Sequence, residues 1–193
     1  MRKIWLNEFY DFCEVNLPET SREVMVDYLK FEADCQTIQI INNSFVVGGM
    51  NNAAVNETER RKFMPRIGYL YPDRQEKLSN VSDMRTLQIA LDGSPYEKLL
   101  ARVSSGDDRN EAESANVTID DVMLEEASRR YSIGFEGGFH LGCFFSFMKL
   151  REQEIKNLTW LAELIQLGFA RNAAGWNKFI SPFQYHLNDN LAK

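Results

Sequence analysis

The chain has 193 residues, a formal net charge of −6 and 44% hydrophobic residues. It is long enough to bury a hydrophobic core without a metal or disulfide. Its net negative charge argues against nucleic acid or anionic lipid as a partner, because both attract basic surfaces. The longest apolar run, residues 144–148 with Ser146 inside it, is far shorter than the roughly 20 residues of a membrane-spanning helix, so no transmembrane segment is predicted.

The N-terminal part of the chain is predicted to form two helices. Residues 2–15 place Trp5, Phe9 and Phe12 at helical spacing, which gives this helix one apolar stripe,. A proline follows and ends it,. The second helix is predicted to run to about residue 42, because apolar residues recur at intervals of three and four. These residues are Val24, Tyr28, Phe31, Cys35, Ile38 and Ile41.

Short elements separated by turns are predicted next. A connector rich in turn-forming residues covers Gly68–Asp73,. Ser82 and Ser94 are the expected caps of two of the short helices, because serine side chains accept hydrogen bonds from the first helical N–H groups. The short helices are expected over residues 57–64, 73–78, 82–91 and 95–103.

The last part of the chain is predicted to hold an acidic loop, two helices and a polar tail. Residues 104–116 carry several acidic residues and almost no large apolar side chain, so we expect a mobile loop there. Thr118 is the expected cap of a helix that ends near Tyr131. A long helix then runs from about residue 137 to residue 169,. No segment alternates with a strand period, so the predicted fold class is all-α, a multi-helix bundle.

Few residues offer nucleophilic or metal chemistry. The three cysteines, Cys13, Cys35 and Cys143, lie far apart and lack the Cys-x-x-Cys spacing of zinc sites,. His140 lies in an apolar segment, where a single histidine is more often a core residue than a base. Nothing near it supplies the third group that a catalytic triad needs. We therefore predict no catalytic residue and no cofactor.

The carboxylates Glu32, Asp34, Glu152 and Glu154 are the alternative, since helical metal enzymes use inward-facing glutamates. The Glu-x-x-His pair of those enzymes does not occur in this sequence. The competing interpretation is ion pairing: Glu152 with Arg151 or Lys156, and Glu154 with a base on a neighbouring helix. Glu152 falls on or beside an apolar stripe, so we expect it to have a partner.

Several blocks of sequence, in this order, resemble one family. They are Phe9–Cys13, Leu29–Asp34 with the ending Asn43-Ser44-Phe45, Phe63–Pro65 with Gly68–Pro72, and Phe139–Glu154 with its continuation Asn157–Glu163. Together they resemble subunit d, the central-stalk subunit of rotary V-type proton ATPases. Family members usually carry a basic pair where this chain has Cys35-Gln36. The family's N-terminal half has no counterpart, so we expect residues 1–183 to be its C-terminal region, followed by a polar tail over residues 184–193.

The resemblance implies a mechanical role. Family members are all-helical, funnel-like bodies of three lobes that lie on the cytosolic face of the proteolipid ring in acidic organelles, such as vacuoles. They receive the central stalk and pass torque, without binding nucleotide. Its motif residues are expected to be structural rather than catalytic: Phe31, Glu32, Asp34, Gly68, Tyr71, Pro72, Glu152, Glu154 and Trp160.

Three functions therefore stay open at this point. The first is a non-catalytic rotor subunit whose partners are the proteolipid ring and the central-stalk subunits. The second is a generic helical adaptor. The third is a carboxylate-metal enzyme. A further expectation applies to the first: a half-length chain should expose apolar surface where the remaining lobes would pack.

Overall fold

Eight helices and no strand occur among the residues that the structure describes, which confirms the all-α prediction. The structure is a computed structural model that describes residues 2–51, 57–103 and 117–168. The chain divides into two compact units, residues 1–109 and residues 110–193. The predicted loop over residues 104–116 and the polar tail over residues 184–193 lie outside the described residues.

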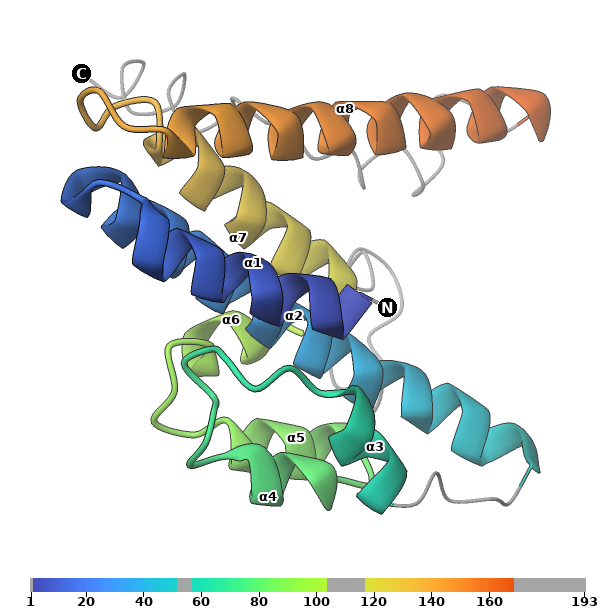
Figure 1. The fold of residues 1–193 in the computed structure, drawn as a ribbon. Helices are drawn as coiled ribbons and strands as arrows, with labels where there is room; N and C mark the ends of the chain where they lie inside the picture. The colour runs from blue at the N-terminus through green and yellow to red at the C-terminus, as the bar shows by residue number, and fades with distance from the viewer. Residues whose placement is uncertain (1, 52–56, 104–116, 169–193) are drawn as a thin grey trace. The chain divides into compact units, whose positions relative to one another are not determined.

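Unit 1 is built around one long helix, α2, with α1 alongside it and four short helices following in the chain (Figure 1). The long helix was predicted to end near residue 42 but continues for two further turns, through a Gly-Gly pair that costs about 1 kcal/mol per residue in a helix. The six helices are α1 (Arg2–Asn16), α2 (Glu19–Asn51), α3 (Glu57–Phe63), α4 (Gln75–Ser79), α5 (Met84–Ala90) and α6 (Glu97–Leu100).

Helix α1 packs on α2 through a face that the sequence pattern did not single out. Leu6 and Cys13 are its buried residues. The predicted stripe lies elsewhere, with Trp5 53% and Phe12 54% exposed. The Trp5 and Phe9 rings stack with centroids 5.2 Å apart, and the Phe9 and Phe12 rings with centroids 6.5 Å apart. The stripe is therefore a row of aromatic side chains on the surface, not the contact with α2.

The core of unit 1 follows the three-then-four pattern of α2. Leu29, Phe31, Ile38 and Ile41 are fully buried, and burying a side chain of this size contributes about 1.5–3 kcal/mol. Four of the six residues of the predicted α2 stripe are therefore confirmed as buried, while Val24 and Cys35 are half-buried. Fully buried side chains from the short helices and their connectors complete this core: Met64, Leu78, Leu87, Leu91, Tyr96 and Leu100.

The short helices of unit 1 begin and end within a few residues of the prediction, but both predicted caps differ: the N-cap of α6 is Tyr96, not Ser94, and it makes no side-chain cap hydrogen bond. Asp83, and not Ser82, caps α5: its side chain accepts a hydrogen bond from the N–H of Thr86, whose hydroxyl in turn accepts one from the N–H of Asp83. This reciprocal pair is a capping box. Both residues can cap, and the one nearest the first helical turn takes the role.

Unit 2 contains α7 (Ile119–Ile133) and α8 (Gly142–Gln166), which pack against each other. Thr118 caps α7 as predicted, in a capping box with Asp121. The Tyr131 ring meets the edge of the Phe145 ring with centroids 6.1 Å apart. No helix in the described part of the chain is both long and apolar enough to span a bilayer.

Candidate functional site

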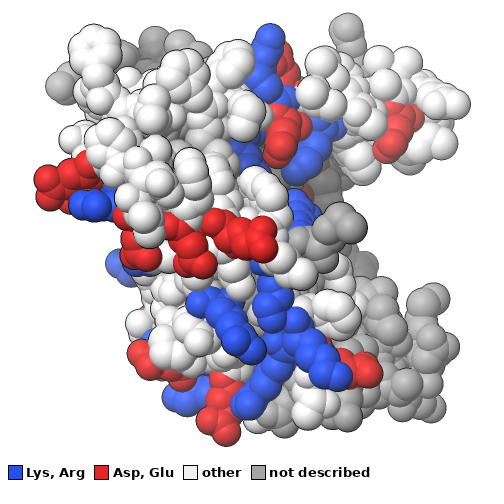
Figure 2. All heavy atoms as spheres, viewed as in Figure 1, with Lys and Arg blue, Asp and Glu red and all other residues white. Residues whose placement is uncertain are grey.

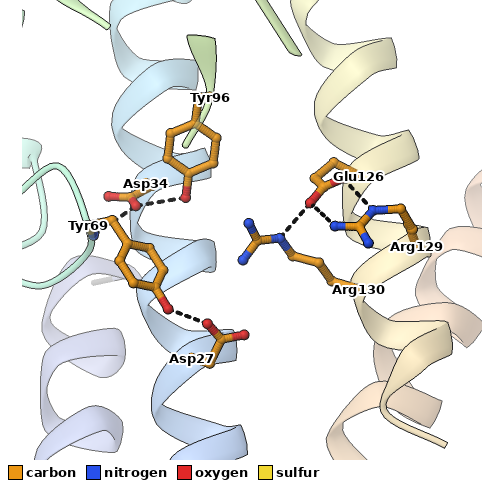
Figure 3. A network of polar contacts seen from close by, with 7 residues as sticks. All are labelled: Asp27, Asp34, Tyr69, Tyr96, Glu126, Arg129 and Arg130. Carbon is orange, nitrogen blue, oxygen red and sulfur yellow. Dashed lines mark hydrogen bonds and ion pairs between the residues drawn. The ribbon is translucent and has the colours of Figure 1, made fainter. Parts of the chain in front are cut away.

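A buried carboxylate on α2 joins three separate segments of unit 1. Asp34 is 1% exposed. It accepts hydrogen bonds from the N–H of Tyr69 at 2.9 Å and from the hydroxyl of Tyr96 at 2.8 Å (Figure 3). It also accepts a hydrogen bond from the N–H of Leu70 at 3.2 Å. A buried carboxylate is costly unless its oxygens are hydrogen-bonded, and here both oxygens have partners. The side chain therefore ties α2 to the connector after α3 and to the start of α6.

Gly68 makes this approach of the connector to α2 possible. Its φ is +122°, a backbone conformation that residues with a Cβ rarely adopt,. A Cβ placed there would lie 2.2 Å from Oδ1 of Asp34 and 3.4 Å from the carbonyl oxygen of Lys30. Only glycine leaves room for the next two N–H groups to reach the carboxylate. We call Asp34, Gly68, Tyr69, Leu70 and Tyr96 the Asp34 joint.

Aromatic side chains pack against each other beside the Asp34 joint. Phe31 and Tyr96 are both fully buried, and their ring centroids lie 6.3 Å apart. Phe31 precedes Asp34 by one helical turn, so both side chains share one face of α2. The sequence predicted Phe31, Asp34 and Gly68 as structural residues, and the structure brings them together.

Tyr69 adds two contacts at the edge of the joint. Its hydroxyl donates a hydrogen bond to Asp27 of α2 (Figure 3). The ammonium of Lys30 lies 5.7 Å from the centroid of its ring, within the range of a cation–π contact. These contacts hold a side chain that is 43% exposed against the helix.

The remaining predicted connector residues lie beside the joint. Tyr71 is 37% exposed and is followed by a cis peptide bond to Pro72. Tyr71 and Asp34 line a recess of about 10 Å³. Ligand pockets measure roughly 300–1,000 Å³, so this recess has room for about one water molecule. The arrangement is suited to holding segments together, not to binding a substrate.

The predicted α8 residues lie on the surface of unit 2. Glu152 is exposed and pairs with Lys149 at 3.6 Å, not with Arg151 or Lys156. Glu154 pairs with Arg151 of the same helix, not with a neighbouring helix. Trp160 is 41% exposed. The expectation that Glu152 has a partner is confirmed, but the partner is Lys149, and the apolar residues beside Glu152, Met148 and Ile155, are exposed.

The four carboxylates of the metal hypothesis fall into two pairs, one in each unit. Asp34 uses both oxygens within its joint, and Glu32, on the same helix, is half-buried. Glu152 and Glu154 belong to unit 2. Among the described residues, no group of three or more His, Cys, Asp or Glu side chains could hold a metal ion.

A second network, on α7, was not predicted. Glu126 is buried and accepts hydrogen bonds from Arg129 at 2.7 and 2.8 Å and from Arg130 at 2.7 Å (Figure 3). Burial acts to raise the pKa of Glu126, but the hydrogen bonds and charges of the two arginines outweigh it and lower the pKa. The spacing of three and four residues is a signal that could have found this network. Tyr96 of the Asp34 joint was also missed, because nothing in its local sequence marks a distant partner.

The comparisons with known proteins agree with the resemblance seen in the sequence. A family described as ATP synthase (C/AC39) subunit matches residues 1–175. The chain is 34% identical over 164 residues to a probable V-type proton ATPase subunit d of Oryza sativa subsp. japonica. It is 32% identical to V-type proton ATPase subunit d2 of Arabidopsis thaliana and 30% identical to V-type proton ATPase subunit d of Saccharomyces cerevisiae.

Each of these three matches covers 84% of this chain but only 42% of the relative's length. The chain thus spans less than half the length of the relatives that it matches. The family match covers both units, including the Asp34 joint and α8. The chain therefore belongs to the ATP synthase (C/AC39) subunit family.

Proposed function

We propose that the chain is a non-catalytic structural subunit of a V-type proton ATPase, which couples the central stalk to the proteolipid ring. Its place would be the cytosolic face of acidic-organelle membranes, as a peripheral component with no nucleotide or cofactor of its own. The relatives are named as subunits of this complex. A subunit that passes torque needs elements that do not shift relative to each other.

The observation that carries the proposal is the Asp34 joint. Leu29–Asp34 and Gly68–Pro72, two of the blocks that resemble the family, meet in this one buried network. Hydrogen bonds to a charged group contribute about 1.5–3 kcal/mol each, and three of them act on one carboxylate. The joint therefore resists a sliding of the connector along α2, which is a property that a torque-bearing body requires.

The test is recovery of the complex by the tagged chain. The chain would be expressed in cells that carry a V-type ATPase, their membranes gently solubilised, and the recovered proteins identified by mass spectrometry. We expect recovery of both the proteolipid and the central-stalk subunits. The variant Gly68→Ala should lower this recovery, while Gly138→Ala should not, because nothing lies within 4 Å of a Cβ at Gly138.

A well-folded chain that recovers neither subunit would contradict the proposal. Folding would be checked on the same material by circular dichroism, so that a loss of structure is not mistaken for a loss of binding. Recovery of unrelated proteins alone would favour the generic helical adaptor. Stoichiometric iron, manganese or zinc in the purified chain would favour the carboxylate-metal enzyme.

A further inference from the structure

Basic side chains gather where α1 begins and α3 ends, in a chain whose 28 acidic residues outnumber its 22 Lys and Arg residues. The ammonium of Lys3, in the first turn of α1, donates a hydrogen bond of 2.8 Å to the carbonyl oxygen of Lys62, in the last turn of α3. Arg66 follows on the connector, and its charge acts on the ammonium of Lys3. We call Lys3, Lys62 and Arg66 the basic patch of unit 1.

The cations of the basic patch are held together without a counter-charge. In the part of the chain that the structure describes, none of the three is paired with a carboxylate. The neighbouring Arg61, by contrast, has a carboxylate oxygen of Glu76 4.0 Å away. Partial burial and the charge of Arg66 together lower the pKa of Lys3. Like charges brought together repel each other, and an anion placed beside them would relieve that repulsion.

A fourth cation lies in the same turn of α3. Arg60 is 8% exposed, and its guanidinium donates hydrogen bonds to the carbonyl oxygens of Ser79 and Val81. Its Nε is buried without a hydrogen-bond partner, and burial lowers the pKa of the side chain. None of the described carboxylates pairs with it. Because salt screens a buried charge less than an exposed one, Arg60 adds to the positive potential of the nearby surface.

The small extent of the basic patch limits which anion fits it. Figure 2 shows the basic side chains over α3 and the start of α1 as one blue area, with red acidic areas close to it on the same face. Exposed charges act on each other over about 10 Å at 0.1 M salt. A long polyanion such as nucleic acid, or an anionic membrane surface, would therefore also meet those acids and be repelled. A short acidic segment meets only the patch.

Exposed apolar side chains adjoin the basic patch along the chain. Phe63 follows Lys62 and is 62% exposed, and Ile4 follows Lys3 and is 60% exposed. A free phosphate ion has no group that could cover them, whereas a polypeptide segment has. Aromatic and arginine side chains together are also enriched in the surfaces through which proteins bind each other. The surroundings of the patch thus favour a polypeptide over a small anion.

We infer that the basic patch of unit 1 binds a short acidic segment of a partner polypeptide, whose carboxylates accept charge-assisted hydrogen bonds from Lys3, Lys62 and Arg66. Apolar side chains of the same segment would cover Phe63. The inference depends on unit 1 alone and is tested on the purified chain. Its failure would therefore leave the recovery of V-type ATPase subunits, which tests the proposed function, unaffected.

The test uses a short labelled peptide of glutamate and leucine, titrated with the full chain and followed by fluorescence anisotropy. The control probes are a peptide with glutamine in place of glutamate, a single-stranded oligonucleotide of the same charge, and vesicles that contain an anionic phospholipid. We expect saturable binding of the glutamate peptide, roughly tenfold tighter than that of any control. The affinity should fall as salt is added, because salt screens exposed charges.

Charge-reversing variants locate the binding on the patch. Lys62→Glu with Arg66→Glu should weaken binding of the glutamate peptide roughly tenfold or more. Both side chains are exposed, and Lys3 contacts the backbone of Lys62, so this pair removes no described contact. The milder pair Lys62→Gln with Arg66→Gln should weaken binding roughly threefold. Lys98→Glu with Lys156→Glu changes the net charge equally at exposed positions outside the patch and should leave binding close to that of the wild type.

Three results would overturn the inference. The first is no saturable binding, or an equal loss in the patch pair and the Lys98 and Lys156 pair, since net charge alone would then act. The second is tighter binding of the oligonucleotide or the vesicles than of the glutamate peptide. The third is a dimer of the chain in sedimentation equilibrium that Lys62→Glu with Arg66→Glu dissociates, since the occupant would then be a second copy.

Discussion

Substituting Gly68 by alanine tests whether the Asp34 joint is set by a single missing side chain. The new Cβ would lie 2.2 Å from Oδ1 of Asp34, a distance that no native contact shows. Asp34 is 1% exposed and projects from the middle of α2, so it cannot move into solvent. Either the carboxylate or the connector must shift, and the hydrogen bonds between them weaken.

The expected loss is the sum of two costs. Holding alanine at a φ of +122° costs about 1–3 kcal/mol,. Losing one hydrogen bond to a buried charged group costs about 1.5–3 kcal/mol. We therefore expect Gly68→Ala to lower the free energy of unfolding of unit 1 by about 2.5–6 kcal/mol. Small domains are stable by only about 5–15 kcal/mol, so this change should be large enough to measure.

Urea denaturation at pH 7, followed by far-ultraviolet circular dichroism, measures the loss. Hydrogen exchange of peptides that contain Tyr69 and Leu70 reports the joint directly. Gly93→Ala separates strain from collision, because Gly93 also has a positive φ, +68°, but its Cβ would meet only the end of the flexible Arg74 side chain, at 3.4 Å. It should cost about 1–2 kcal/mol. Gly138→Ala should change nothing.

The reasoning would be refuted if Gly68→Ala cost no more than Gly93→Ala. A double-mutant cycle adds a second check, since Asp34→Ala removes the atom with which the new Cβ collides. The cost of Gly68→Ala should then fall by about 1–3 kcal/mol. Equal costs in both backgrounds would mean that the two residues are not coupled.

Three further predictions concern single contacts. Tyr96→Phe keeps the ring beside Phe31 but removes a hydrogen-bond donor to a buried carboxylate, so it should lower the free energy of unfolding, measured by urea denaturation, by about 1.5–3 kcal/mol. Tyr71→Phe, at a half-exposed site, should lower it by almost nothing. Equal effects of the two substitutions would contradict the role of the Tyr96 hydroxyl. Because the pKa of Glu126 is lowered in the folded chain, its contribution is present above the ordinary glutamate pKa of about 4.3 and lost as the pH falls through the folded value. Glu126→Gln should therefore lower the melting temperature at pH 7, and the difference from wild type should shrink at pH 3; a difference independent of pH would exclude this mechanism. Thr118→Ala should lower the stability of unit 2 by about 1 kcal/mol through loss of the cap, and Thr118→Ser should restore most of it in thermal unfolding.

Features of this fold could be predicted from the sequence where they depend only on residues close together in the chain. The buried face of α2 and the Thr118 cap followed directly from spacing and residue type. The face of α1 could not be predicted in this way, because Trp5, Phe9 and Phe12 are regularly spaced whether or not a partner covers them. Periodicity identifies an apolar face but not what packs on it.

The candidate site shows the same division. Resemblance to the family marked Asp34 and Gly68 as structural residues. Their contact, and the part played by Tyr96, depends on bringing together residues 34 and 96, which lie 62 positions apart in the chain. Glu152 illustrates the same limit, since its position in the pattern predicted a partner but not which one, and the structure pairs it with Lys149.

The sequence by itself determined the helical class, the existence of the main helices and the family, because each rests on short-range spacing or on blocks read in order. The tertiary structure decided which faces are buried and which polar groups meet. The reason is physical: burial and hydrogen bonding of a buried charge depend on segments that are distant in the chain and become neighbours only after the backbone has turned at positions such as Gly68,.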